Sequence, residues 1–456
     1  MTSSLLKELG FLGLVIVGVF LLMPKNTATS FDTNIKVENK DKLLRFNKNG
    51  EFKILQISDM HYANGKDTPC RDVLPSQMES CSDLNTTHYL RRFIDVEKPD
   101  LILFTDMHYA NGKDTACRDV LPSQMETCSD LNTTHYLRRF IHTENPDLIV
   151  FTGDNVHSVD AYNYNRSMDE AFAAAIESNI PWIAVLGNHD VNTLVTGTPR
   201  KAVMEYIVGL KNTLSLLNPS NLEQDESIWG WGNYNLEVAG VQDSPLQNKS
   251  VLNLYLLDSG EFTYSLPPNF YMGYEWIHPS QQSWFLRTSK QLQQAYTSPP
   301  EAQQGPAPGL VFFHIPIPEY SNITESNMVG EKQEDVYCPG VNSGFYDTML
   351  AAGDIKAAFV GHGHINDYCG KLRDIQLCYG AGFGYHGYGL AGWARRARVI
   401  NVKLDKTEDG DWGPVKSIVT WKRLHDDRLT LIDPEVLWAS TTVQQADAKC
   451  LTSSLV

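Results

Sequence analysis

Several features that are typical of other protein classes are absent from this 456-residue chain, and each absence excludes a kind of function. There is no low-complexity tract and no coiled-coil repeat, which argues against a fibrous or disordered protein. There is no excess of basic residues, and the formal net charge of −16 disfavours nonspecific nucleic-acid binding as the main function. The glycine-rich residues 380–389 lack the Gly-Lys-Ser/Thr ending of a phosphate-binding loop. No Cys-x-x-Cys motif occurs, which disfavours a structural zinc site.

A hydrophobic run long enough to span a membrane comfortably is also missing. The uncharged residues 9–23 suit the core of a signal peptide, whereas a spanning helix needs about 20 apolar residues. We therefore predict a signal peptide over residues 1–28 and a secreted or vacuolar location, with no stable membrane partner. The flank, Lys7 beside Glu8, is only weakly positive, so an uncleaved anchor is the alternative. Five Asn-x-Ser/Thr triplets support the secretory route, at Asn85, Asn132, Asn165, Asn248 and Asn322.

The eight cysteines fit an oxidising compartment better than a metal site. Cys369 and Cys378 flank a predicted hairpin and would close a short loop. One further spacing occurs twice, in Cys70 with Cys81 and in Cys117 with Cys128. We predict two or three disulfides.

The most unusual feature is a tandem repeat, because residues 59–105 recur almost verbatim as residues 106–152. Two copies are too few for a solenoid, so a recent duplication or a joining error in the gene explains the repeat better. Each copy contains a loop, a predicted helix and an apolar strand. One copy is therefore surplus to a single strand–helix–strand unit.

Elsewhere the chain alternates between strand and helix patterns without an evident linker. Residues 43–58 predict a hairpin that turns at residues 47–50. The spacing of Ser167 and Glu170 predicts a capping box for a helix over residues 168–178, and a second helix is predicted over residues 201–217. The sequence thus predicts one α/β catalytic domain over residues 43–440.

Polar side chains follow five apolar runs, where an α/β protein places its chemistry. These clusters are Asp59-Met60-His61, Gly153-Asp154-Asn155, Gly187-Asn188-His189-Asp190, His314, and Gly361-His362-Gly363-His364. Taken alone, His314 is more simply a buried core histidine, and Asp154 could cap a helix. Two imidazoles beside one another in a buried turn, such as His362 and His364, are costly without a cation. Together the five clusters indicate a metal centre assembled from separate loops.

This ordered set of motifs resembles that of the calcineurin-like metallophosphoesterases, over nearly the whole chain after residue 28. Three further stretches, at residues 74–78, 180–182 and 392–396, are similar to the plant group called purple acid phosphatase 28/29-like. The resemblance implies a two-sheet α/β/β/α sandwich and a site for two ions of Fe, Mn or Zn, which suit carboxylate, amide and imidazole ligands. It also implies hydrolysis of small phosphate esters.

Transferred onto this sequence, the family pattern assigns a role to each motif residue. Asp59, His61, Asp154 and His364 would hold one ion, and Asn188, His314 and His362 the other, with Asp154 bridging them. His189 would assist the leaving group or the phosphoryl oxygens, oriented by Asp190. Asp106 and His108 compete with Asp59 and His61 for the same place. We assign the earlier pair because the predicted hairpin supports its strand.

Two departures from the purple enzymes bear on the chemistry. Their first motif ends in glycine, where this chain has His61, as in the phosphodiesterase branch. Their metal-bound tyrosine is replaced by His157, which argues against the iron–phenolate colour. We therefore predict an acid phosphomonoesterase, with a phosphodiesterase and a glycoprotein inactivated by the duplication as the alternatives. The metal pair, the natural substrate and the oligomeric state stay open.

Overall fold

The computed structural model describes residues 44–57, 65–67, 101–104, 128–130, 148–159, 161, 164–178, 181–191, 199–220, 227–265, 271–382, 388–390, 393–394, 396–424 and 430–440. All of them belong to one compact unit, Thr33–Val456. Within these ranges, no helix combines the length and the apolar composition that crossing a membrane requires. The predicted leader, residues 1–28, lies outside them.

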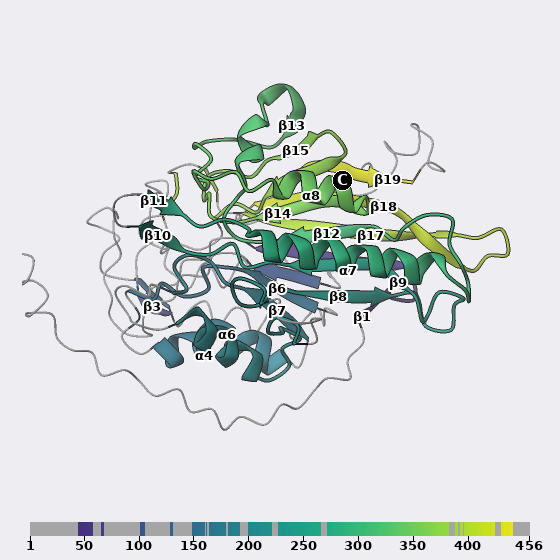
Figure 1. Ribbon diagram of the computed structural model, residues 1–456, viewed down its shortest axis with the longest axis horizontal. Helices are drawn as coiled ribbons and strands as arrows, with labels where there is room; N and C mark the ends of the chain where they lie inside the picture. The colour runs from purple at the N-terminus through teal and green to yellow at the C-terminus, as the bar shows by residue number, and fades with distance from the viewer. Residues whose placement is uncertain are drawn as a thin grey trace, which may run out of the picture. The chain divides into compact units, whose positions relative to one another are not determined.

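Two sheets carry most of the described strands (Figure 1). The seven-stranded sheet has the order β19 (Leu431–Ala439), β18 (Trp412–Leu424), β17 (Arg396–Lys406), β2 (Glu51–Ile57), β4 (Leu101–Phe104), β6 (Leu148–Thr152) and β7 (Trp182–Val185). Its half from β2 to β7 is parallel. The carboxyl ends of these four strands therefore share one edge of the sheet.

The eight-stranded sheet has the order β1 (Leu44–Arg45), β8 (Tyr234–Ala239), β9 (Ser250–Leu256), β12 (Gly309–Phe312), β14 (Ile355–Val360), β16 (Ile375–Tyr379), β15 (Cys369–Leu372) and β13 (Met328–Val329). Its centre, from β9 to β16, is parallel. Two small antiparallel pairs complete the strands, β10 (Phe262–Ser265) with β11 (Tyr271–Tyr274) and β3 (Gly65–Asp67) with β5 (Cys128–Asp130). Two 3-10 turns, Pro318–Asn322 and Glu325–Asn327, precede β13.

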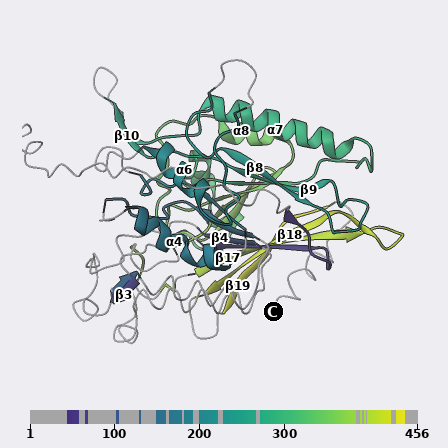
Figure 2. The ribbon, with the colours of Figure 1, turned by 90° about the horizontal axis from the view of Figure 1, so that it is seen from below.

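Alternation along the buried strands separates two hydrophobic layers. In β12, Leu310 and Phe312 belong to the core shared with the seven-stranded sheet, whereas Val311, and Phe313 directly after the strand, belong to the core on the other face. That outer face is covered by α7 (Pro279–Thr297) and α8 (Phe345–Ala352). Against the seven-stranded sheet lie α4 (Tyr164–Ser178) and α6 (Arg200–Gly209), and Figure 2 shows α4 near β4 and apart from α7 and α8. The predicted α/β/β/α sandwich is confirmed.

The helix predicted over residues 201–217 is shorter in the structure, because a tertiary contact replaces its second half. The helix α6 ends at Gly209, and Leu210 is already extended. The next residues run along β7 instead, where Trp182 donates to the carbonyl of Asn212 and Leu214 donates to the carbonyl of Trp182. At the other predicted helix, α4 begins at Tyr164, so Ser167 lies inside the helix and not at its cap.

The predicted hairpin over residues 43–58 is wrong. The turn forms, with Gly50 donating to the carbonyl of Asn47 at 2.9 Å. However, β1 pairs with β8 in the eight-stranded sheet, whereas β2 pairs with β17 and β4 in the other. The turn therefore links the two sheets instead of closing a hairpin, because both strands pair with partners distant in sequence. The strands of both repeat copies, β4 and β6, are paired side by side.

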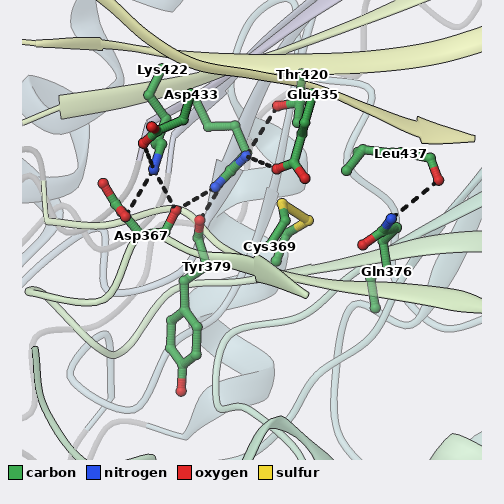
Figure 3. Close-up of a disulfide and its surroundings, with 12 residues drawn as sticks. Asp367, Cys369, Gln376, Tyr379, Thr420, Lys422, Asp433, Glu435 and Leu437 are labelled. Carbon is green, nitrogen blue, oxygen red and sulfur yellow. Dashed lines mark hydrogen bonds and ion pairs between the residues drawn. A yellow bond between two sulfur atoms is a disulfide. The ribbon is translucent and has the colours of Figure 1, made fainter. Parts of the chain in front are cut away.

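Buried charges and a disulfide lie between the two sheets (Figure 3). The predicted Cys369–Cys378 bridge joins β15 to β16. Close to it, Lys422 of β18 lies between Asp367, at 2.8 Å, and Asp433, at 2.6 Å. The Asp367 carboxylate also accepts from Arg396 at 2.7 Å. Asp367 follows the Gly361–His364 motif by three residues, so this network fixes the end of that loop. The side chains of the other predicted cysteine pairs, Cys70 with Cys81 and Cys117 with Cys128, lie outside the described part of the chain, so these pairs stay predictions.

Candidate metal centre

The described motif residues all follow carboxyl ends of parallel strands, as predicted. Asp154 follows β6 and Asn188 follows β7 in one sheet, whereas His314 follows β12 and His362 follows β14 in the other. The two sheets thus bring four loops to one edge of the sandwich.

The side chains at this edge converge closely. Asp154, His314 and His362 each offer a ligand atom, and these three atoms lie within 4.8 Å of one another. The His314 Nε2 atom is 3.2 Å from Asp154 Oδ2 and 2.8 Å from Asn188 Oδ1. The rings of His314 and His362 meet edge to face at 5.1 Å. Four of the seven predicted metal ligands therefore lie in one cluster.

His364 is buried on the same loop as His362, with its ring held from two sides. Its Nδ1 atom is 3.0 Å from the carbonyl oxygen of Tyr388, and the two rings stack at 3.8 Å. A histidine that donates one ring N–H to a carbonyl is oriented to bind a metal through the other nitrogen. The predicted ligands Asp59 and His61 lie outside the described residues, as do Asp106 and His108.

Two ligand residues have the left-handed backbone that non-glycine residues rarely adopt, with φ of 46° at Asp154 and 71° at His362. Two glycines allow the loops to approach this closely. A Cβ on Gly187 would lie 2.2 Å from both the amide nitrogen and Oδ1 of Asp154. A Cβ on Gly153 would lie 2.7 Å from Nδ1 of His314. Larger residues at these positions would separate the ligands.

Burial controls the charge of the imidazoles. Burial lowers the pKa of His362 well below its usual value, and the nearby His314 lowers it further, against the opposing effect of Asp154. Burial likewise lowers the pKa of His189 to about 4, again opposed by Asp154. Both side chains are therefore neutral over most of the physiological pH range, which is the form that binds metal or donates through a single N–H.

The donor set fits metal ions. The Nδ1 atom of His314 is 3.3 Å from the carbonyl oxygen of Thr152. If Nδ1 donates there, the Nε2 lone pair faces the oxygens of Asp154 and Asn188, an arrangement that a cation bound to all three atoms stabilises. A buried carboxylate, an amide oxygen and imidazoles suit Fe, Mn or Zn.

Asp190, predicted to orient His189, is found holding the two ligand loops together. Its fully buried carboxylate accepts from the amides of Gly187, at 2.8 Å, and Val156, at 2.7 Å, and from the side chain of Asn155, at 2.9 Å. These contacts join the loop after β7 to the loop after β6. The orienting role stays a prediction.

His189 itself contacts the cluster of predicted ligands. Its amide donates to Asp154 Oδ1 at 2.5 Å, and its half-buried ring stacks on His157 at 4.7 Å with an interplanar angle of 24°. His157, the residue at the position of the missing tyrosine, is thus part of the site.

Arg200 and Asp258 also support the site, and the sequence analysis missed both. Arg200, the first residue of α6, donates from Nη1 to the carbonyl of Gly187 at 2.9 Å and from Nε to Asp258 Oδ2 at 3.1 Å. Its Nη2 atom contacts Asp258 Oδ1. Asp258 follows the apolar strand β9, so the strand-end pattern that revealed the other motifs was present here too.

Comparison with known proteins gives consistent matches. The family model described as "Calcineurin-like phosphoesterase" matches residues 52–366. The chain is 49% identical to "Probable inactive purple acid phosphatase 29" of Arabidopsis thaliana, over 87% of this chain and 88% of that protein. It is 44% identical to "Probable inactive purple acid phosphatase 14" of the same plant, over 88% and 87%.

Two further likenesses are more distant. The chain is 31% identical to "Phosphatase DCR2" of Saccharomyces cerevisiae, over 84% of this chain and 55% of that protein. A crystal structure titled as a dimetal phosphatase from Danio rerio is similar at 14% identity and a TM-score of 0.37, over 68% of this chain and 91% of the other. With the family model covering well over half of its length, the chain belongs to the calcineurin-like phosphoesterases.

Proposed function

We propose that this protein hydrolyses phosphate monoesters with the help of two metal ions held at the described edge of the sandwich. The observation that carries the proposal is the convergence of Asp154, Asn188, His314 and His362 within one buried cluster. Ions bound there would supply Lewis acidity to the phosphoryl group and lower the pKa of an attacking water. The Asp154 carboxylate, which contacts His314 and the amide of His189, would be a ligand of these ions.

The side chains around the ligands would have two further roles, which are hydrogen bonding to the substrate and fixing the ligand loops. His189, half-buried beside Asp154, would donate a hydrogen bond to a phosphoryl or leaving-group oxygen. Asp190 and Arg200 would keep the ligand loops at fixed spacing, because each bonds to the Gly187 backbone. Precise spacing of this kind supports catalysis by holding reactants in place.

A test on His189 separates its role from metal binding. His189→Ala should lower kcat by about 10²- to 10⁴-fold while the bound metal content stays unchanged, since a positioned proton donor contributes about that much. The measurements are metal analysis and steady-state kinetics on 4-nitrophenyl phosphate. Loss of metal from the variant would instead place His189 among the ligands.

The second candidate function is a phosphodiesterase, which the first motif favours because it ends in histidine. Parallel assays with 4-nitrophenyl phosphate and bis(4-nitrophenyl) phosphate decide between the two. Faster turnover of the bis-ester by the same preparation would replace monoester hydrolysis as the function.

The names of the plant relatives support a third candidate, a protein without catalytic activity. Against it stands the intact set of described ligands, because a buried carboxylate and imidazole cluster is costly to keep without a cation. Metal analysis of the purified protein tests this point. Two ions per chain with no hydrolysis of either ester would favour the inactive protein.

We also propose entry into the secretory pathway, with small phosphate esters and not nucleic acid as the substrates.

A further inference from the structure

An aromatic surface begins at one of the ligand histidines and leads away from the cluster. The ring of Tyr274 in β11 meets the ring of His362 edge to face, with centroids 4.6 Å apart. Across the β10–β11 pair, Tyr274 lies opposite Phe262, and their rings are 5.6 Å apart in a T-shaped contact. A chain of rings thus leads from a metal ligand to Phe262.

The same hairpin face is apolar and open to solvent. Phe262 is 47% exposed and Met272, two residues before Tyr274 in β11, is 64% exposed. Alternate residues of a strand share a face, so Met272 and Tyr274 lie on the face that holds Phe262. Glu261 and Glu275 lie on the opposite face, where the Glu261 amide donates to Glu275 Oε2 at 3.3 Å.

A second set of aromatic residues lies around the other ligand histidine. The Tyr388 ring, 37% exposed, stacks on His364, and its hydroxyl donates to Glu334 at 2.7 Å. Glu334 is fixed by accepting from the amide of Ile365 at 3.0 Å. The site is thus bordered by exposed rings and by an acidic group, which favours an uncharged aromatic group over a further anion.

We propose that the Phe262–Tyr274–Met272 surface binds an aromatic leaving group of the phosphoester, so that the substrates are monoesters with an uncharged ring one or two bonds from the ester oxygen. The proposal rests on the proposed function for its phosphate-binding centre. It follows from the contact between the rings of His362 and Tyr274, because a phosphoryl group held near His362 places the rest of the ester against the ring of Tyr274. Phe262 is a specificity-determining residue in this view, since its ring meets that of Tyr274 and it is not itself a predicted ligand.

Binding of non-hydrolysable phosphonates tests the surface independently of catalysis. The Kd values of benzylphosphonate, cyclohexylmethylphosphonate and methylphosphonate would be measured by calorimetry on Mn²⁺-loaded protein. Wild-type protein should prefer benzylphosphonate to methylphosphonate by roughly tenfold and to cyclohexylmethylphosphonate by roughly threefold. Phe262→Ala should abolish both preferences, Phe262→Leu should abolish the preference over the cyclohexyl compound, and Leu216→Ala, at another exposed apolar residue, should change neither.

Each alternative result has one meaning. A preference for benzylphosphonate that survives Phe262→Ala overturns the proposal, and equal binding of the ring and cyclohexyl compounds overturns its aromatic part. Failure to bind any phosphonate overturns it together with the phosphate-binding centre. Retained preferences in a protein that hydrolyses no ester would uphold the surface and reject the catalytic function.

Discussion

At the scale of single residues, the candidate metal centre is held in place by side chains that are not among its predicted ligands. Arg200 is buried, contacts both oxygens of Asp258 and also holds the Gly187 carbonyl. An arginine provides this planar set of donors and a lysine does not. Such supporting groups typically change metal affinity by about 10- to 100-fold when they are removed.

Arg200→Lys should therefore weaken metal binding by roughly tenfold or more, because the lysine keeps the charge but cannot satisfy Asp258 and Gly187 together. Metal affinity by competition with a chelator is the measurement. The matched control is Lys201→Met, at the adjacent exposed residue that pairs with Glu205 at 3.5 Å. Equal affinities for Arg200→Lys and wild type would show that Arg200 does not position the loop.

The histidine at position 157 leads to a spectroscopic prediction. It takes the place of the metal-bound tyrosine of the purple enzymes, and its ring stacks on His189. Without a phenolate on iron, the iron-loaded protein should be colourless. Absorption spectra of the iron-loaded wild type and of His157→Tyr check this, and only the variant should gain a visible band. A strong visible band in the wild type would mean that another phenolate binds the iron.

At the scale of elements, the strand order bears on which repeat copy supplies the first motif. The register aligns Ile57 of β2 with Phe104 of β4, and Phe104 with Phe151 of β6. Asp59, Asp106 and Gly153 each follow these residues by two positions. β4 lies directly beside β6, whereas β2 lies one strand further away, so β4 ends nearer than β2 to the Asp154 loop.

The strand order therefore favours Asp106 and His108, against the sequence-based assignment of Asp59 and His61. That assignment relied on a hairpin partner for β2, which pairs with β17 instead. Asp106→Asn should lose at least tenfold in metal affinity and in activity, whereas Asp59→Asn should keep both. Loss in the Asp59 variant alone would restore the earlier assignment, and no loss in either would mean that the copies substitute for each other.

The strands also show which features of the structure could be predicted from the sequence and which could not. The strand-end pattern predicted that Asp154, Asn188, His314 and His362 would come together, and these four side chains do converge, because buried strands are apolar and polar residues mark where they end. Pairing partners were not predictable in this way, since a strand's apolar run does not specify which sheet it joins. The pairing of β1 with β8 and the replacement of the second half of α6 by contacts to β7 both depend on distant residues.

At the scale of the whole compact unit, buried charged side chains join the two sheets. The hydropathy pattern of the sequence does not show which charged residues will be buried in this way. Asp367, from the loop after β14, meets Lys422 of β18, whereas Arg398 of β17 donates to the carbonyls of Tyr379 and Asp367. Burial raises the pKa of Asp367, but Lys422 and Arg396 outweigh this effect and hold it below its usual value. Asp367 is thus ionised in the folded state and balances part of the buried positive charge.

Glu435, in β19 beside this network, should make stability depend on pH. Burial raises the pKa of Glu435 to about 7, against the opposing effects of Arg398 and Lys422. Arg398 Nη1 is 3.8 Å from Glu435 Oε1, too far for a hydrogen bond. Between the ordinary glutamate pKa of about 4.3 and pH 7, the folded protein holds a proton that the unfolded chain has released. This contribution to the unfolding free energy is complete below that window and is lost as the pH rises through about 7.

Glu435→Gln removes that titration, so the variant should lose less stability than wild type as the pH rises from 5 to 7. The difference between the two slopes can reach about 1.4 kcal/mol per pH unit, the value for one proton. Urea unfolding at several pH values measures it, and contributions from all other groups cancel in the comparison. Glu408→Gln, in the exposed turn between β17 and β18, is the matched control and should follow the wild type. Parallel slopes for wild type and Glu435→Gln would mean that Glu435 is charged in the folded protein and that its contact with Arg398 compensates for burial.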